Sequence, residues 1–102
     1  MSEISESVRP FGIAIDYDDT FTTDPEAWAK VIDVLTEAGA KVVCVTSRGP
    51  NEPITDFPGQ VFYTSGDLKA EFMAKQFVNY EIKIWIDDMP EHIGPPPEIK
   101  FG

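Results

Sequence analysis

The order of its apolar segments is the feature of the sequence that most limits the folds open to this chain. Four short runs rich in β-branched residues have the length of buried strands and span residues 11–17, 41–46, 60–64 and 83–86. Apolar residues at three- and four-residue spacing predict helices over residues 25–38 and 68–79. Strands that alternate with helices predict an α/β fold, a compact Rossmann-like arrangement of three layers around a mainly parallel sheet.

Local signals mark where the predicted elements begin and end. Asp24 is a candidate N-cap and Pro25 suits the first helical position, so the first helix should begin there. Gly39 ends the apolar pattern of that helix. The stretch 49–59 is rich in Pro, Asn and Asp and is predicted to be a loop with one helical turn over residues 52–56. The predicted inner face of the second helix consists of four residues: Phe72, Met73, Gln76 and Phe77.

Charge and hydropathy argue against several classes of function. Eighteen acidic and eight basic side chains give a net charge of −10, which repels nucleic-acid duplexes and anionic membranes. No apolar run approaches the roughly 18 residues needed to span a bilayer, and residues 1–7 do not resemble a signal peptide. Cys44 has no intramolecular disulfide partner, which fits a reducing compartment. We expect a cytoplasmic protein that neither coats duplex nucleic acid nor binds membranes.

The whole pattern is expected to form one domain. Its length of 102 residues is usual for a single unit with one core, so residues 1–102 should fold together. The runs at either end, about residues 1–9 and 93–102, are predicted to be extended tails. The second of these contains Gly94 followed by three prolines, which lack backbone donors.

Polar side chains follow the predicted strands at their carboxyl ends, where ligands bind in open α/β sheets. They come from four separated segments: Asp16 and Asp18, Thr46, Asp87 and Asp88, and Lys69 near the start of the second helix. Because the carboxyl ends of parallel strands meet at one edge, we expect these groups to lie together. The sequence therefore predicts a site that combines carboxylates, a hydroxyl and an ammonium group.

This combination of groups suits phosphoryl transfer with a hard cation. Mg²⁺ prefers carboxylate and carbonyl oxygens and also accepts an oxygen from a phosphate. One carboxylate can attack phosphorus, and a second, two residues further on, can move the proton of the leaving group. The hydroxyl and the ammonium group can bind phosphoryl oxygens as negative charge shifts onto them.

Three motifs of the chain resemble those of the haloacid dehalogenase-like superfamily. Its first motif, Asp-x-Asp-x-Thr or Val after an apolar strand, is matched by Asp16-Tyr17-Asp18-Asp19-Thr20. Its second motif, a Thr or Ser that ends a strand, is matched by Thr46, and its fourth, an acidic pair after another strand, by Asp87-Asp88. The resemblance covers essentially all of the chain from the first predicted strand to Asp88.

The resemblance implies a role for each matched residue. Asp16 would be the nucleophile and a metal ligand, and Asp18 the general acid and base that also offers its backbone carbonyl to the metal. Thr46 would bind the phosphoryl group, while Asp87 and Asp88 would complete the ligands of a Mg²⁺ ion.

The third motif of the superfamily is only a lysine, so Lys69, Lys75 and Lys83 are all candidates. Lys69 is preferred because it precedes Asp87 by about one helix and one strand. Lys75 falls in the middle of the predicted helix, and Lys83 at the wrong end of its strand.

The resemblance also predicts the class of reaction. The second carboxylate of the first motif, Asp18, favours hydrolysis of phosphate esters over dehalogenation. The gaps between motifs are too short for an inserted cap domain, so the chain resembles a small capless member. We expect a Mg²⁺-dependent phosphatase that hydrolyses a phosphate monoester through an aspartyl-phosphate on Asp16. Two alternatives stay open: a polynucleotide end phosphatase, and a metal-binding regulatory module of the same fold with low turnover.

Other polar residues near the motifs have more than one interpretation. Arg48 could meet a phosphate, Asp56 or solvent, and His92 is interpreted as a solvated surface residue rather than a substrate contact. Asp19 is expected to face away and hold the loop, and Thr20 to serve the turn. The expected partner is a phosphorylated small molecule or macromolecular end, and whether a second copy in a homodimer supplies a lid stays open.

Overall fold

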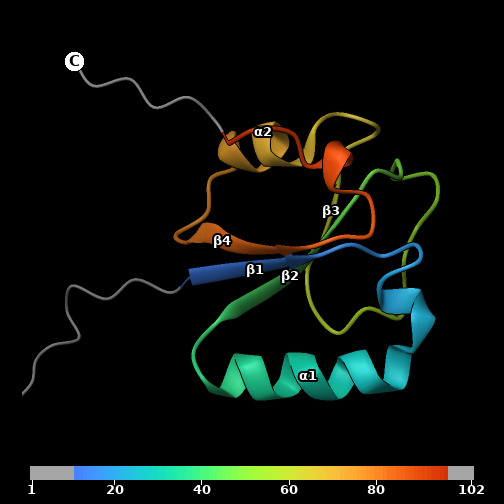
Figure 1. Cartoon of the computed structure of the whole chain (residues 1–102), viewed down its shortest axis with the longest axis vertical. Coiled ribbons are helices and arrows are strands. Elements are labelled where there is room, and N and C mark those ends of the chain that lie inside the picture. Colours follow the sequence, from blue (N-terminus) through green and yellow to red (C-terminus); the bar gives the residue numbers. More distant parts are fainter. Residues whose placement is uncertain (1–10, 97–102) are drawn as a thin grey trace, which may run out of the picture.

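Four parallel strands form the centre of the fold. The structure, a computed structural model, describes residues 11–96. Its strands are β1 (Phe11–Ile15), β2 (Lys41–Thr46), β3 (Val61–Tyr63) and β4 (Glu81–Ile86). They pair in the order β3-β2-β1-β4, and every pair is parallel. Helix α1 (Pro25–Glu37) covers one face of the sheet and α2 (Lys69–Ala74) the other (Figure 1). The predicted α/β fold class is confirmed.

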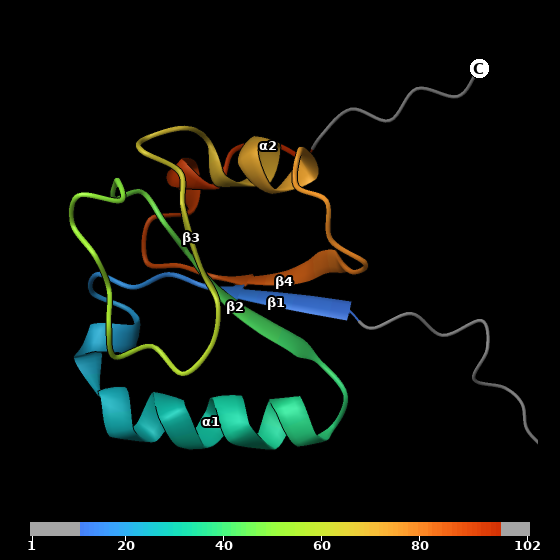
Figure 2. The ribbon, with the colours of Figure 1, turned by 180° about the vertical axis from the view of Figure 1, so that it is seen from behind.

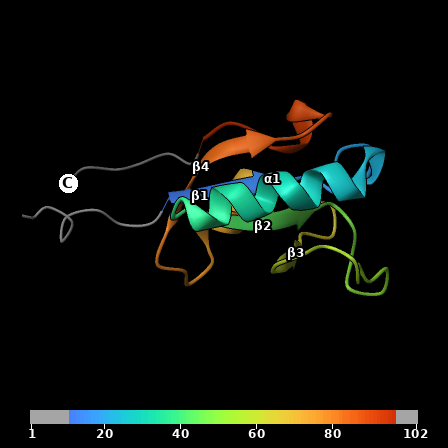
Figure 3. The same ribbon diagram turned by 90° about the horizontal axis from the view of Figure 1, so that it is seen from below.

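The central strands are apolar on both faces because both faces are covered. On β1, Ile13 and Ile15 belong to the hydrophobic cluster that includes Ile32 of α1. The residue between them, Ala14, belongs to a second cluster that includes Met73 of α2. Seen from below, α1 lies across β1 and β2 (Figure 3). Burial on two sides explains why these strands appear in the sequence as continuous apolar runs.

All the loops that follow the strands leave the sheet at the same end. In Figure 1 they gather on the right, and in the reverse view of Figure 2 on the left. Two short 3-10 helices, η2 (Phe21–Thr23) and η3 (Pro90–His92), lie in these loops. This end of the sheet is where the sequence places its candidate site.

Helix α1 begins and ends where its sequence signals predict. The side chain of Asp24 accepts a hydrogen bond from the backbone N–H of Ala27 at 3.2 Å, and Pro25 occupies the first helical position. Gly39, just after the helix, has a φ of 104°. A side chain would be strained in this left-handed region, which is why glycine ends the helix there.

Helix α2 is shorter than predicted, since it ends at Ala74 rather than at residue 79. Its last bonds tighten to three-residue spacing, with Gln76 N–H donating to the carbonyl of Met73 at 3.1 Å. Beyond the helix, Val78 and Tyr80 supply the apolar contacts with the second cluster, at a spacing of two residues. The prediction that Phe77 belongs to the inner face is wrong, because its side chain is fully exposed.

The helical turn predicted over residues 52–56 is also wrong, since the structure has no helix there. The tight turn lies earlier, where Glu52 N–H donates to the carbonyl of Gly49 at 2.9 Å. Pro53 follows at once and disfavours helical geometry in the residue before it. The chain is then held by Ile54, whose N–H donates to the hydroxyl of Tyr63 at 2.9 Å.

The four strands are those predicted; β2 has the predicted ends, and the ends of the other three are shifted. β1 stops at Ile15, two residues early, because the next residues form a turn in which Phe21 N–H donates to the Asp16 carbonyl at 3.2 Å. β3 loses one residue at each end. β4 begins at Glu81, two residues early, and its pairing with β1 is irregular opposite Gly12 and Ile13.

The predicted tails lie mostly outside the described residues. Residues 1–9 and 97–102 fall outside them, whereas residues 93–96 are described. Ile93 is half-buried, and its carbonyl accepts a hydrogen bond from Ala70 N–H at 2.9 Å, so this stretch is attached to α2. Within residues 11–96, no helix is long and apolar enough to cross a membrane.

Cys44 is expected to be unreactive in the native protein. It lies in β2 with no exposed surface, and burial raises the pKa of its thiol from 9.0 to about 12. Little reactive thiolate therefore forms between pH 7 and pH 9 in the folded chain. We expect a thiol reagent to label the native protein slowly at both pH values. The urea-unfolded protein should be labelled quickly, and its labelling rate should be higher at pH 9 than at pH 7. Equal labelling rates with and without urea would contradict the buried position.

Candidate metal centre

The ends of β1 and β4 place three carboxylates together. Asp16 follows β1 directly, and its N–H donates to the carbonyl of Ile86, the last residue of β4, at 2.9 Å. Asp87 and Asp88 come immediately after that residue. One carboxylate oxygen from each of the three aspartates lies within 4.8 Å of the others. Adjacent parallel strands thus bring together residues about seventy positions apart in the sequence.

These three aspartates form a group that fits a hard divalent cation. All the atoms they offer are carboxylate oxygens, the ligands preferred by Mg²⁺ and Ca²⁺, and no sulfur or imidazole that would favour a softer metal belongs to the group. Asp16 is buried, Asp87 is half-buried as a whole residue but has a side chain only 2% exposed, and Asp88 is exposed, so the group opens to solvent on the side of Asp88. The acidic cluster could therefore bind a metal ion, whose identity the structure leaves open.

Lys69 bridges two of the three carboxylates. Its Nζ lies 2.8 Å from Asp16 Oδ1 and 2.6 Å from Asp87 Oδ2, and its side chain is only 1% exposed. It is the first residue of α2, which begins just after Ser65 and Gly66 turn the chain with positive φ angles. A buried ammonium group is tolerated here because two carboxylates surround it.

The other two candidate lysines lie elsewhere. Lys75 follows the end of α2 and is exposed, and Lys83 is an exposed residue of β4 that pairs with Glu81 at 3.5 Å. Of the three lysines, Lys69 contacts the acidic cluster.

Thr20 contributes a hydroxyl to the same cluster. Its Oγ1 lies 3.1 Å from Asp16 Oδ2 and 3.3 Å from Asp88 Oδ1, so its proton can bond to either carboxylate. Sequence reasoning gave Thr20 a role in the turn only. The available signal was its place in the first motif, four residues after Asp16.

The cluster concentrates negative charge. Burial raises the pKa of Asp16, the ammonium group of Lys69 opposes this shift, and the carboxylates of Asp88 and Asp87 add to it. The group contains three carboxylates and a single ammonium group, so part of its negative charge is uncompensated. A divalent cation at this position would relieve the remaining repulsion.

Asp18 lies outside this cluster and pairs with Arg48. Its Oδ1 and Oδ2 accept hydrogen bonds from Nη2 and Nε of Arg48 at 2.7 Å and 2.9 Å. The guanidinium group lowers the pKa of Asp18. The Asp18 and Arg48 side chains are 53% and 30% exposed, so water screens the pair and can hydrate both charges when it opens.

Arg48 and Asp56 do not pair with each other in the structure, and both contact Tyr17 instead. The guanidinium carbon of Arg48 lies 5.0 Å from the centre of the Tyr17 ring, a cation–π contact. Asp56, one of the partners considered for Arg48, instead accepts a hydrogen bond from the Tyr17 hydroxyl at 2.7 Å. Asp19 is exposed and has a φ of 62°.

Two buried threonines end neighbouring strands at this edge. Thr46 is the last residue of β2, is 1% exposed, and accepts a hydrogen bond at Oγ1 from Arg48 N–H at 3.2 Å. Thr64 follows β3 and is equally buried, and its hydroxyl has no partner among the described residues. Thr64 is not among the predicted site residues, although it is the last residue of the predicted strand 60–64. His92, at the end of η3, is exposed.

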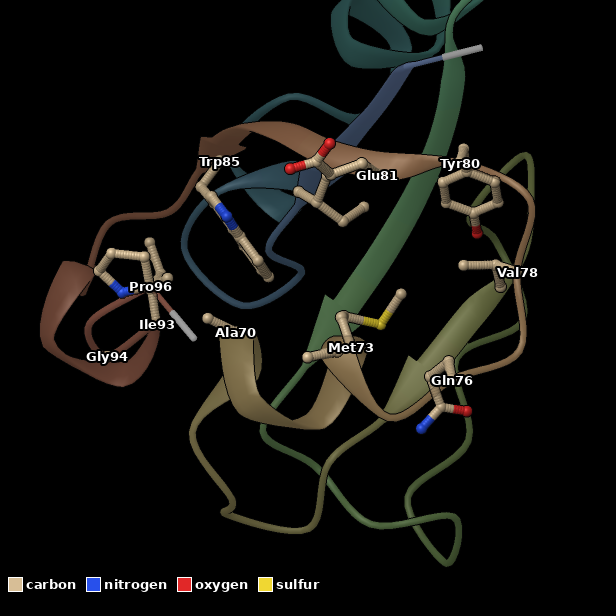
Figure 4. Close-up of a pocket in the computed structure, with 12 residues that line it drawn as sticks. Ala70, Met73, Gln76, Val78, Tyr80, Glu81, Trp85, Ile93, Gly94 and Pro96 are labelled. Carbon is tan, nitrogen blue, oxygen red and sulfur yellow. The ribbon is translucent and has the colours of Figure 1, made fainter. Parts of the chain in front are cut away.

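A separate apolar cavity lies between α2 and β4. Its volume is about 650 Å³, and Met73, Trp85 and Ile93 are among the residues that line it (Figure 4). None of the three clustered aspartates lines it. The cavity is therefore distinct from the candidate metal centre.

Comparisons with known proteins give no family for this chain. No family model, curated protein or solved structure matched it.

Proposed function

We propose that this chain is a Mg²⁺-dependent phosphatase of the haloacid dehalogenase-like type, which hydrolyses a phosphate monoester through an aspartyl-phosphate on Asp16. The observation that carries the proposal is the position of Lys69 Nζ, 2.8 Å from Asp16 and 2.6 Å from Asp87. A lysine, a threonine and three aspartates from distant segments meet at the strand ends, and several of them occupy the motif positions of that superfamily.

Asp16 is suited to be the nucleophile because its carboxylate is already oriented. Lys69 holds Oδ1 and Thr20 lies beside Oδ2, so the side chain needs little reorganisation before it reacts. A carboxylate oxygen of Asp16 attacks phosphorus, the bond from phosphorus to the ester oxygen breaks, and the leaving alcohol departs. Water then attacks the aspartyl-phosphate, releases inorganic phosphate and regenerates the carboxylate.

Asp18 would carry the proton in both steps. In its protonated form it would donate that proton to the leaving oxygen, and it would then accept one from the attacking water, which restores the protonated form. Both of its oxygens are held by Arg48 in the structure, so this role requires the exposed pair to open. The hydroxyl of Thr46 can donate to a phosphoryl oxygen, since its own oxygen accepts a hydrogen bond from Arg48 N–H.

The cation would be held by the carboxylates of Asp16, Asp87 and Asp88, with the backbone carbonyl of Asp18 as the further ligand that the resemblance implies. When bound, Mg²⁺ lowers the repulsion between the anionic nucleophile and the anionic substrate. Met89 N–H supports this arrangement by donating to Asp87 Oδ1 at 2.9 Å, which fixes the orientation of that carboxylate.

Removal of the metal is the direct test. We expect the purified protein to hydrolyse p-nitrophenyl phosphate in the presence of MgCl2, and excess EDTA to lower the rate by at least about 100-fold, because the cation supplies several kcal/mol of charge stabilisation. Added MgCl2 should restore the rate. A metal-binding module without catalysis would instead be stabilised by Mg²⁺ against thermal unfolding while hydrolysis stayed at background, and this result would contradict the proposal.

A further inference from the structure

Arg48 is anchored at the candidate site through its backbone. Its N–H donates to Thr46 Oγ1 at 3.2 Å, and its carbonyl accepts from Ser65 N–H at 3.0 Å. These bonds attach it to the ends of two neighbouring strands, β2 and β3. The side chain, by contrast, is 30% exposed. A fixed base with an exposed guanidinium group is the arrangement expected of a residue that can change partners.

The position of Arg48 distinguishes it from the five lysines of residues 11–96. Lys69 is buried and already occupied by two carboxylates. The other four lysines lie away from the carboxyl ends of the strands. Lys30 is on α1, Lys41 begins β2, Lys75 follows α2 and Lys83 is within β4. Among residues 11–96, Arg48 is therefore the partly exposed cationic side chain in the loops at the carboxyl ends of the strands.

The guanidinium group has donors left for a ligand. It carries five N–H groups in a planar fork that matches carboxylate and phosphate oxygens. Two contact Asp18, and a third reaches the carbonyl of Glu52 at the long distance of 3.5 Å. The remaining donors have no partner within the described part of the chain.

The pair between Arg48 and Asp18 conflicts with the acid–base role of Asp18. Both carboxylate oxygens are engaged, so Asp18 cannot reach a leaving oxygen while the pair is closed. An anion that binds the guanidinium group in place of Asp18 would release this carboxylate without leaving the cation unpaired. A substrate that carries a second anionic group next to its phosphoryl group would supply such an anion.

We infer that Arg48 exchanges Asp18 for a second anionic group of the substrate, so that the site selects phosphate monoesters that carry a further phosphate or carboxylate. This inference rests on the proposed phosphatase function. A small bisphosphate, a phosphorylated acid and the phosphorylated end of a nucleic-acid strand all share this chemistry. The exchange makes Arg48 a determinant of specificity.

Matched pairs of substrates test the inference. Adenosine 3′,5′-bisphosphate is compared with the two adenosine monophosphates, and 3-phosphoglycerate with glycerol 3-phosphate. In at least one comparison, we expect kcat/KM to be about 10- to 100-fold higher for the compound with two anionic groups than for the compound with one. This is the effect of one or two charge-assisted hydrogen bonds. The first pair tests a second phosphate and the second pair a carboxylate. No preference in either pair overturns the inference.

Variants of Arg48 separate recognition from positioning. In Arg48→Gln the preference should fall to about 1, and Arg48→Lys should keep part of it, since a lysine retains the charge but not the planar fork. Lys41→Gln removes the same charge at the opposite end of the sheet and should keep the full preference. If Arg48→Gln lowers kcat/KM for both members of a pair by the same factor, Arg48 only positions Asp18 and the inference is wrong.

A binding measurement keeps the inference separate from the proposed function. Calorimetric titration of the wild-type protein with adenosine 3′,5′-bisphosphate and with each of the two adenosine monophosphates, in MgCl2, needs no turnover. We expect the bisphosphate to bind about 10-fold more tightly or better, and Arg48→Gln to remove the difference. This result without hydrolysis would contradict only the phosphatase proposal, whereas equal affinities would contradict the role of Arg48.

Discussion

Replacement of Asp16 by asparagine is expected to lower kcat for p-nitrophenyl phosphate by at least about 10³-fold, the scale of loss when a nucleophile is removed. An amide oxygen is a far weaker nucleophile than a carboxylate, so the aspartyl-phosphate would not form. The change keeps the size of the side chain and an oxygen for the hydrogen bond from Lys69, which lies 2.8 Å from Asp16 Oδ1. Steady-state kinetics with excess MgCl2 measure the effect.

Asp19→Asn is the matched control for this experiment. It makes the same chemical change three residues away, at an exposed position. The φ of 62° at Asp19 lies in the left-handed region that asparagine adopts readily. We expect Asp19→Asn to keep activity within about threefold of the wild type, as is usual for surface substitutions away from a site. Undiminished turnover in Asp16→Asn would contradict the assignment of the nucleophile.

Much of the fold follows from the sequence because both faces of the sheet are covered. Burial on two sides makes β2 (Lys41–Thr46) a continuous apolar run, which periodicity identifies with both ends correct. The length of α2 was harder to predict. Phe77 continues the helical spacing but is exposed in the structure, while Val78 and Tyr80 pack on the second cluster. Apolar spacing alone does not tell which of two neighbouring residues is buried.

The sequence predicted which strand ends meet, but not how their side chains pair. Asp16 and Asp87 come together because β1 and β4 are adjacent and parallel, a consequence of topology. The pairing of Asp18 with Arg48 and the contact of Thr20 with the cluster depend instead on side-chain directions in a turn that contains a left-handed residue. Motif spacing carries no information on such directions. Sequence reasoning therefore located the site better than it described its hydrogen bonds.

Lys69→Met is expected to have the largest effect on stability. The change removes a side chain that is 1% exposed and leaves Asp16 and Asp87 buried beside each other without their shared cation. Loss of one partner from a buried ion pair typically costs about 3–5 kcal/mol, because the remaining charge is uncompensated. Urea unfolding in the presence of EDTA would measure the loss of unfolding free energy.

Lys75→Met is the control, because Lys75 follows the same helix and is exposed. Its unfolding free energy should change by no more than about 0.5 kcal/mol, as for most surface substitutions.

The candidate metal centre adds a second expectation, since a divalent cation can replace the charge that Lys69→Met removes. Mg²⁺ at 100 times its dissociation constant stabilises the form that binds it by about 2.7 kcal/mol. Excess MgCl2 should therefore restore part of the stability lost in Lys69→Met and have little effect on a variant that also carries Asp87→Asn. If Mg²⁺ fails to stabilise Lys69→Met, the three aspartates do not hold the cation.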